Sequence, residues 1–350
     1  MSQNETHKGE NVLRFDPNKP LQVGGQAVIE GVMMRAPGRI ATAVRRAGGE
    51  IVVKWKNYTS LSEKHGFFKL PIVRGAVGLV EMMFIGIETL NFSAEVAMHD
   101  IEQKEKPPGN GAPPKPVKKK SNWKIALTVV FSLTVGIAIF FLTPLVVATQ
   151  FFTVDQDAFA FNLVAGVIRI ALLLAYLSAI SLMKDVKRLF RYHGAEHKAV
   201  FTFESGGELT PGSAMGYTRF HPRCGTSFIL IVMVSSILLF AILDSFLIGV
   251  LGTITLPVRL VTHIPFIPLV GGVAYEFIRW SARRSTTPLG KALVAPGLWL
   301  QRITTREPED GMLEVAIVAL TCALGAAPPH GIRVIEHISE LVPAIPAEHV

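Results

Sequence analysis

The stretch Thr226–Leu251 reads TSFILIVMVSSILLFAILDSFLIGVL and contains a single charged residue, Asp244. A membrane hydrocarbon layer about 30 Å thick is crossed by roughly 20 residues of helix, so this stretch is long and apolar enough to span it. Three further stretches have the same character: Trp123–Phe152, Phe161–Met183 and Leu256–Trp280. The last one contains Pro257, Pro265 and Pro268, which predict a kinked or interrupted helix. The sequence therefore predicts a mainly α, polytopic membrane helix bundle with four spans.

The composition excludes most other classes of protein. Of the 350 residues, 49% are hydrophobic and 18% are charged, whereas soluble chains carry about 25% charge. The two cysteines, Cys224 and Cys322, are too few for a disulfide scaffold. Residues 1–20 are polar, so we expect a disordered head without a cleavable signal peptide. We attribute the net charge of +8 to membrane topology rather than to nucleic-acid binding.

The basic residues predict the orientation of the spans. They lie before the first span (Lys115, Lys118, Lys119, Lys120, Lys124), between the second and third (Lys184, Lys187, Arg188, Arg191, Lys198, Arg219, Arg223) and after the fourth (Arg279, Arg283, Arg284, Lys291). Because loops rich in lysine and arginine remain cytoplasmic, we expect both termini and the long middle loop to lie in the cytoplasm. The remaining cytoplasmic parts are then a Lys/Pro-rich linker (99–121), a His/Cys loop (185–225), a C-terminal region (282–325) and a loose tail (326–350).

Two further elements precede the linker. Residues 67–98 predict an amphipathic helix, since Arg74, Glu81, Glu88 and Glu95 recur every seven residues on one narrow face. Lipid does not tolerate such a stripe, so the helix either lies in the cytoplasmic interface or enters the membrane with its stripe facing the bundle. We favour the interface, which keeps the N-terminal region cytoplasmic. Residues 21–66 predict a small β element with runs at Gln26–Met34, Ile40–Arg46 and Glu50–Trp55.

The chemistry-bearing residues gather in the His/Cys loop. In the string His193-x-x-Glu196-His197, a helix would place two imidazoles one turn apart on one face, as zinc ligation requires. In the H-x-x-E-H pattern the glutamate acts as general base. Either His221 or Cys224 would supply the third ligand. Two histidines with a thiolate or a third imidazole favour zinc or a similar borderline metal over Mg²⁺ or Ca²⁺.

Cys224 also supports a different mechanism. It directly precedes the third span, and a helix N-terminus favours the thiolate, so Cys224 beside His197 or His221 is a candidate nucleophile. A five-residue pattern also arises by chance, in which case the histidines anchor the chain at the interface while Glu196 and Lys198 are solvated. We interpret Cys322 as helix packing.

The apolar spans contain five ionisable residues: Arg169, Asp244, Arg259, His263 and Glu276. Such groups usually face the bundle interior and pair, or line a polar path. A structural pair of Arg169 with Asp244 or with Glu276 is one interpretation. A transport pathway through these residues is the other.

Several strings resemble the bacterial YqhQ-like family: GGQAVIEGVMMR (24–35), PIVRG (71–75), YHGAEHK (192–198), HPRCGTSF (221–228), Tyr275-Glu276, APG (295–297) and TREP (305–308). That family is a membrane group of unknown function, classed as predicted metal-dependent enzymes. The resemblance implies that the string 24–35 belongs to the same functional unit as the histidines. Within it, Glu30 is a further ligand, a partner for a histidine N–H, or one half of a structural salt bridge.

These observations lead to one principal hypothesis and two alternatives. The protein is expected to be a metal-dependent hydrolase at the cytoplasmic face of the bacterial inner membrane, acting on a membrane-proximal peptide or lipid-linked substrate. Its expected partners are membrane lipids and such a substrate, and no nucleic acid. The alternatives are an assembly or scaffold factor with a structural metal site, and a transporter of a small solute or ion. The predicted catalytic residues are Glu196, as general base, and Lys198; the predicted ligands are His193, His197, His221 and Cys224; further functional residues are Gln26, Glu30, Arg35, Arg74, Arg223 and Glu276.

Overall fold

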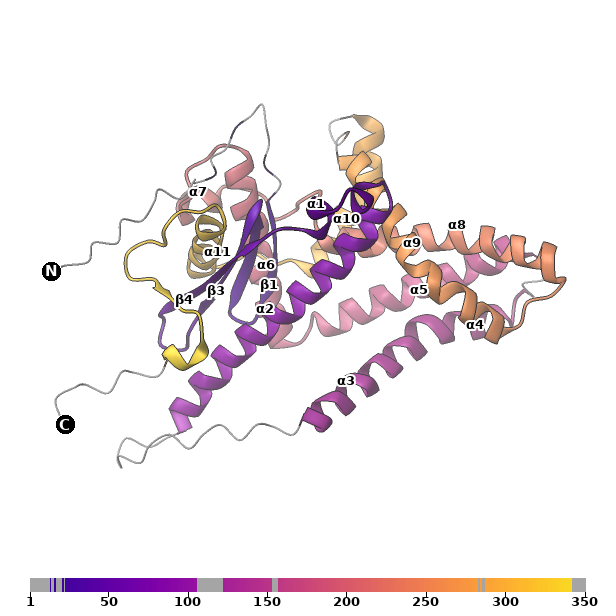
Figure 1. The fold of residues 1–350 in the computed structure, drawn as a ribbon, viewed down its shortest axis with the longest axis horizontal. Helices are drawn as coiled ribbons and strands as arrows, with labels where there is room; N and C mark the ends of the chain where they lie inside the picture. Colours follow the sequence, from indigo (N-terminus) through magenta and orange to yellow (C-terminus); the bar gives the residue numbers. More distant parts are fainter. Residues whose placement is uncertain are drawn as a thin grey trace.

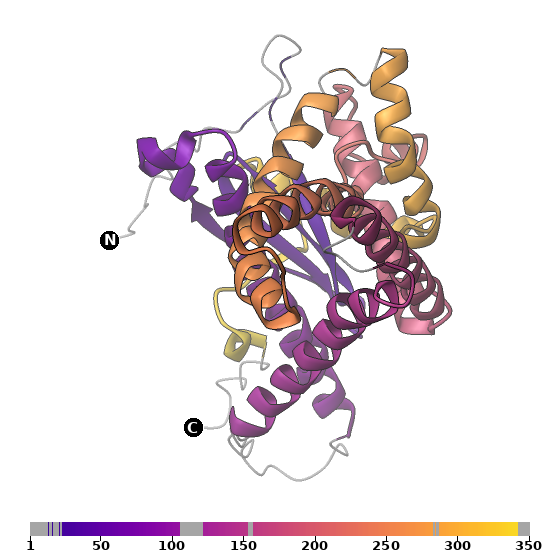
Figure 2. The ribbon, with the colours of Figure 1, turned by 90° about the vertical axis from the view of Figure 1, so that its right-hand side faces the viewer.

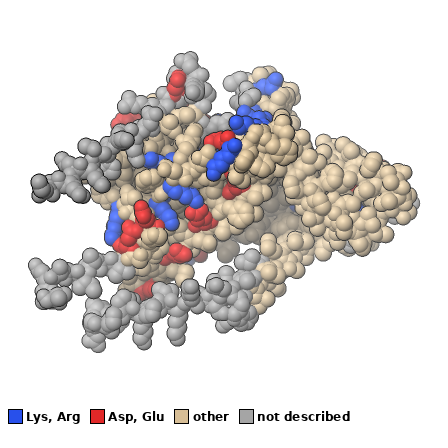
Figure 3. Space-filling view, viewed as in Figure 1, with Lys and Arg blue, Asp and Glu red and all other residues tan. Residues whose placement is uncertain are grey.

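The computed structural model describes residues 13, 16, 21, 23–105, 122–152, 157–282, 284 and 287–341. The expected head, most of the expected linker and the end of the expected tail lie outside these residues. Helices extending to one side form a bundle, and a sheet with its covering helices forms the other part of the molecule (Figure 1). The charged side chains visible in Figure 3 gather on the sheet-containing part, while the far end of the bundle is almost entirely uncharged.

Four helices of the described chain are long and apolar enough to cross a membrane, as the sequence predicts: Val130–Ala148, Ala158–Ile180, Gly225–Leu251 and Pro257–Ser281. The first joins α3 (Asn122–Ile137) to α4 (Thr143–Ala148) through a π-helical turn at Ala138–Leu142. The others are α5 (Ala158–Ile180), α8 (Gly225–Leu251) and α9 (Leu256–Ala282), seen along the bundle in Figure 2. Pro265 and Pro268 lie inside α9, which continues through both, so of the two expected outcomes, a kink or an interruption, the interruption does not occur there.

The predicted β element is a sheet of β1 (Gly24–Val28), β2 (Gly31–Ala36), β3 (Gly38–Arg45) and β4 (Ile51–Tyr58) in antiparallel order. The run expected at Gln26–Met34 is two strands, because the chain turns at Ile29-Glu30, where Glu30 has a φ of 54°. A fifth strand, β5 (Arg333–Val334), adds in parallel to β4. Ile335 and Leu341, which ends the 3₁₀ turn η3 (Ile338–Leu341), are buried beside it, so this part of the expected loose tail is docked.

The sheet is covered on both faces. Against one face pack α6 (Lys184–Glu204), α7 (Pro211–Met215) and α11 (Asp310–Ala323), with Val32 and Met34 of β2 in their shared core. The alternate residue of β2, Met33, faces the opposite side and meets Ile85 of α2 (Val73–Glu105). The segment expected to carry the histidines and Cys224 (185–225) contains α6, a helix of 21 residues that follows α5 after a short turn.

The amphipathic helix α2 begins later than expected, after α1 (Leu61–Lys64) and a 3₁₀ turn η1 (Gly66–Lys69). Its stripe contacts protein in part: Glu81 is buried and accepts hydrogen bonds from Ser60 Oγ and the Leu61 N–H, both at 2.6 Å. Glu88 is exposed and pairs with Lys56, and Glu95 is also exposed. Large apolar side chains on other faces are exposed, among them Met83, Phe84 and Ile87. The interfacial position of α2 stays a prediction. A further helix between α9 and α11, α10 (Pro288–Thr304), was not expected from the sequence.

Candidate metal centre

Helix α6 carries three of the predicted site residues on one face. His193, Glu196 and His197 occupy successive turns, and the two imidazole ring centres are 4.5 Å apart. Gly194 brings α6 against the chain that follows α10, since a Cβ at this position would lie 2.0 Å from the Arg306 carbonyl oxygen. This close approach lets the carbonyl group of Thr304 reach the ring of His193.

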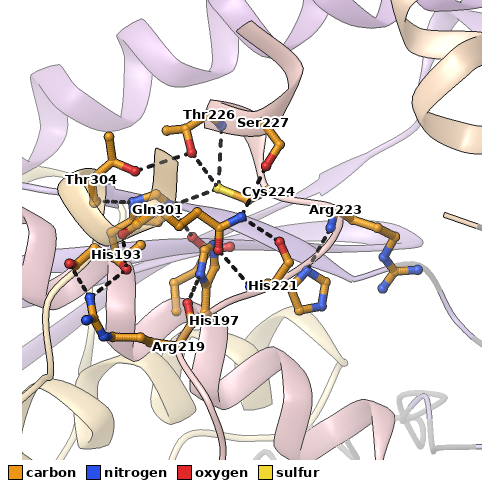
Figure 4. A network of polar contacts seen from close by, with 12 residues as sticks. His193, His197, Arg219, His221, Arg223, Cys224, Thr226, Ser227, Gln301 and Thr304 are labelled. Carbon is orange, nitrogen blue, oxygen red and sulfur yellow. Dashed lines mark hydrogen bonds and ion pairs between the residues drawn. The ribbon is translucent and has the colours of Figure 1, made fainter. Parts of the chain in front are cut away.

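Both histidines are oriented by backbone carbonyl groups (Figure 4). Nδ1 of His193 lies 2.8 Å from the Thr304 oxygen, and Nδ1 of His197 lies 2.5 Å from the Arg219 oxygen. Because a carbonyl oxygen only accepts hydrogen bonds, each Nδ1 must carry the hydrogen. Each Nε2 is therefore left with an available lone pair, which is the usual arrangement of a metal-binding histidine. Burial lowers the pKa of His197 and so favours its neutral form.

Cys224 completes a group of three potential ligands. It is the N-cap of α8, and its Sγ accepts a hydrogen bond from the Thr226 N–H and lies 3.3 Å from His193 Nε2. One ligand atom from each of His193, His197 and Cys224 lies within 4.8 Å of the other two. A tetrahedral zinc ion separates nitrogen and sulfur ligands by about 3.3–3.6 Å, so small side-chain rotations would bring the three onto one ion.

Glu196 lies beside this group. It is buried, its Oε2 is 3.9 Å from His193 Nε2, and it accepts a hydrogen bond from the Gly25 N–H. Burial raises the pKa of the carboxyl group, and the nearby His193 and His221 oppose this shift. Gly25 is needed for the close approach of β1, because a Cβ there would lie 2.3 Å from the Met33 oxygen and 3.0 Å from Glu196 Cγ.

His221 is adjacent but uses both of its nitrogens elsewhere. Its Nδ1 accepts the Arg223 N–H at 3.2 Å, and its Nε2 lies 3.3 Å from a carboxylate oxygen of Glu204. Burial lowers the pKa of His221 to about 4. Of the two candidates for the third ligand, the geometry thus brings Cys224 to His193 and His197. Arg223 also pairs with Glu204, and burial lowers its pKa.

Gln301 was not predicted as a site residue from the sequence. It fixes the segment of chain that lies between the two histidines of α6 and Cys224. Its side chain is fully buried, accepts the His221 N–H and donates to the His221 carbonyl oxygen, both at 2.7 Å (Figure 4). It also donates to Ser227 Oγ at 3.1 Å. The available signal was the polar pair Gln301 and Thr304, three residues apart in an apolar helix, which marks one face of α10.

The string 24–35 does approach the site, but only in part. Gln26 and Arg35 line a cavity of about 810 Å³ together with His193, His197 and Cys224. Glu30 lies elsewhere: it forms an ion pair with Arg188, and its Oε2 accepts a hydrogen bond from the Tyr192 hydroxyl at 3.3 Å. Its expected role as a metal ligand or histidine partner is therefore wrong, and the salt-bridge interpretation describes it.

Two other predicted functional groups also lie outside the cavity. Lys198 is buried and its Nζ contacts the Met215 carbonyl oxygen at 3.0 Å and Glu307 at 2.9 Å. Arg74 forms a two-pronged ion pair with Glu276, at 2.6 and 2.5 Å, which joins α2 to α9. Lys198, Arg74 and Glu276 therefore link structural elements to one another.

The charges within the bundle pair differently from the expectation. Asp244 and Arg259 are 2.5 Å apart, and His263 lies 3.3 Å from the other oxygen of Asp244. Arg169 instead donates to the Phe140 carbonyl oxygen at 3.0 Å, within the π-helical turn, and contacts Ser236 Oγ at 3.4 Å. The expected pairing of Arg169 with Asp244 or Glu276 is thus wrong.

Comparisons with known proteins identify relatives without assigning an activity. A family model described as "Protein of unknown function (DUF1385)" matches residues 70–326. The "Uncharacterized protein YqhQ" of Bacillus subtilis (strain 168) is 31% identical over 317 residues, which cover 85% of this chain and 91% of that protein. No solved structure matches the chain.

Proposed function

Because the chain belongs to the YqhQ-like DUF1385 family of unknown function, we propose its activity from the site itself: hydrolysis assisted by a divalent metal, best fitted by zinc. His193, His197 and Cys224 would hold the ion. The observation that carries this proposal is that two carbonyl groups fix both Nδ1–H groups, so that both Nε2 lone pairs are available beside the Cys224 sulfur.

The donor set matches the requirements of zinc. Nitrogen and sulfur donors suit zinc and similar borderline metals, whereas Mg²⁺ and Ca²⁺ prefer oxygen. Three protein ligands are also the number found in catalytic zinc sites, where the fourth position remains open. Zinc supplies Lewis acidity toward water and the bond to be hydrolysed.

Glu196 would be the general base. Its carboxylate lies close enough to His193 to receive a proton from a water molecule at the same site, since Oε2 and Nε2 are 3.9 Å apart. Burial raises the pKa of Glu196, which brings this group nearer to the range of an efficient base at neutral pH. The Gly25 N–H fixes the orientation of the carboxylate.

The substrate would reach the site from the membrane surface. The cavity is lined by residues of the sheet and α6 and also by Ile229 and Tyr275, which lie in two of the candidate spans. We therefore expect a membrane-proximal peptide or a lipid-linked molecule, handled on the cytoplasmic side of the inner membrane. The basic residues that flank the spans support this orientation.

One observation favours a structural metal site instead. The three ligands come from α6 and from the N-cap of the membrane helix α8, so a bound ion would also fasten the sheet-containing part to the bundle. In that case the protein would serve as an assembly or scaffold factor.

Metal analysis of the purified protein tests the site. We expect about one zinc per wild-type chain and a loss of that zinc in His193→Ala and Cys224→Ser. The exposed His65 and the buried Cys322 provide the matched controls His65→Ala and Cys322→Ser, which should keep it. A metal-free wild type, or ligand variants with full metal content, would overturn the proposal. Glu196→Gln then separates the two roles: full metal with loss of the cellular phenotype supports catalysis, and a retained phenotype supports the structural role.

A further inference from the structure

The cavity beside the metal centre contains a cation with no anionic partner among the described residues. Arg35 lies at the end of β2 and lines the cavity. Two neutral groups contact it: Nη1 lies 3.2 Å from Met82 Sδ, and the guanidinium lies 4.8 Å from the ring centre of Tyr58. The second arginine of the cavity, Arg223, is already paired with Glu204. Arg35 is therefore the guanidinium available to an anionic group that enters.

The rest of the lining is suited to an apolar group. Leu189 and Phe190 of α6, Met82 of α2 and Ile229 of α8 all contribute to the cavity. A volume of about 810 Å³ is within the range of sites that enclose a ligand the size of a lipid headgroup with part of its chain. The cavity thus offers one cationic position and an extended apolar wall.

The position of the cavity matches the depth of lipid headgroups. Ile229 is the fifth residue of α8, which places it about 6 Å from the start of that helix. Tyr275 is seven residues before the end of α9, about 10 Å from it. Both helices are candidate spans, so these residues mark the border between the hydrocarbon layer and the headgroup region.

Two carboxylates also line the cavity and limit the identity of the guest. Glu63 is exposed on α1, and the carboxylate of Glu196 is held beside His193 by the Gly25 N–H. A guest with a cationic headgroup would meet Arg35 unfavourably. A guanidinium instead binds phosphate oxygens through paired, charge-assisted hydrogen bonds.

We propose that the cavity binds a membrane lipid with an anionic phosphate headgroup, which Arg35 recognises while the acyl chain lies along Leu189, Phe190 and Ile229. This inference rests on the proposed function, because it names the substrate class of the same site. It makes Arg35 a specificity-determining residue rather than a catalytic one.

Binding to the full-length protein in detergent tests the inference, with short-chain phosphatidic acid as the probe. Diacylglycerol with the same chains lacks only the phosphate, inorganic phosphate lacks only the lipid, and a phosphopeptide replaces the lipid by another kind of macromolecule. We expect phosphatidic acid to bind more tightly than inorganic phosphate and the phosphopeptide, which lack the acyl chains that would lie along the apolar wall. We expect it to bind at least about tenfold more tightly than diacylglycerol, since a hydrogen bond to a charged group is worth about one factor of ten. Arg35→Gln should remove this preference, and Arg39→Gln, on the neighbouring strand and outside the cavity, should keep it.

Three results would overturn the inference: equal binding of diacylglycerol, equal binding of the phosphopeptide or inorganic phosphate, and an unchanged preference in Arg35→Gln. Ile229→Trp serves as a second variant, because its larger side chain would fill the cavity and should weaken lipid binding without changing the charge. Zinc content is measured on the same samples. If Arg35→Gln loses the lipid preference but keeps its zinc, the loss is due to the headgroup contact. If the wild-type protein contains no zinc, the proposed function is refuted, and this result is distinct from the lipid measurement.

Discussion

Replacing Gln301 with leucine tests whether the site depends on a residue that touches none of the proposed ligands' side chains. Gln301 is fully buried and its amide satisfies both backbone groups of His221. Leucine has a similar size but offers no hydrogen bonds, so two buried backbone groups lose their partners. Each unsatisfied group costs about 1–3 kcal/mol, which gives about 2–6 kcal/mol if the segment does not move.

In this variant we expect the segment that carries His221 to shift, because a shift would let water form hydrogen bonds with the two unpaired backbone groups. It also carries the Arg219 carbonyl group that orients His197 and, three residues beyond His221, the Cys224 sulfur. Loss of such supporting contacts typically weakens metal binding about 10- to 100-fold. We expect Gln301→Leu to weaken zinc affinity by this factor, measured by competition with a chromophoric chelator, and to lower the melting temperature in detergent. The control is Gln103→Leu, on the exposed end of α2. Wild-type zinc affinity in Gln301→Leu would refute the supporting role assigned to Gln301.

Three further predictions concern the scaffold around the site. Asp244→Asn leaves Arg259 without its buried counter-charge and should destabilise the protein by about 3–5 kcal/mol, seen as a lower melting temperature; an unchanged melting temperature with lost solute uptake would instead favour transport. Gly194→Ala forces a Cβ to within 2.0 Å of the Arg306 oxygen, so the yield of folded protein should fall sharply, whereas Gly212→Ala, which faces open space, should fold normally. Arg74→Gln removes the half-exposed link to Glu276 and should cost about 1 kcal/mol in thermal unfolding, an effect that must disappear in a Glu276→Gln background.

The membrane spans and the helical pair of histidines could be predicted because each depends on a single segment. An apolar run of about 20 residues spans a membrane whatever its neighbours do, and two histidines four residues apart share a face of any helix. The apolar spacing of Leu313–Leu324 likewise indicates the helix α11 from a single segment. Local periodicity is sufficient information in these cases.

The choice between His221 and Cys224 could not be predicted, because it depends on how the chain between α6 and α8 returns. Gln301 and Thr304, about 80 and 110 residues from the groups they hold, set that path. The prediction of Lys198 as a catalytic residue failed because it relied on sequence adjacency to His197. One residue along a helix turns a side chain by about 100°, and Lys198 faces Glu307 instead of the cavity. The predicted charge pairs within the bundle were wrong for a similar reason, since such pairs depend on how each helix is rotated about its axis.

The geometry of the site ties its formation to the assembly of the whole chain. His193 and His197 lie on a helix outside the candidate spans, while Cys224 caps a helix that is one of them. The carbonyl groups that orient the two rings come from two other segments, at Arg219 and Thr304. None of these segments brings the three ligand atoms together by itself, so the lone pairs converge only after α8 and α10 are in place against α6. A site built in this way would bind metal weakly in any partly folded chain, so a bound metal would stabilise the completed arrangement of bundle and sheet over every earlier one.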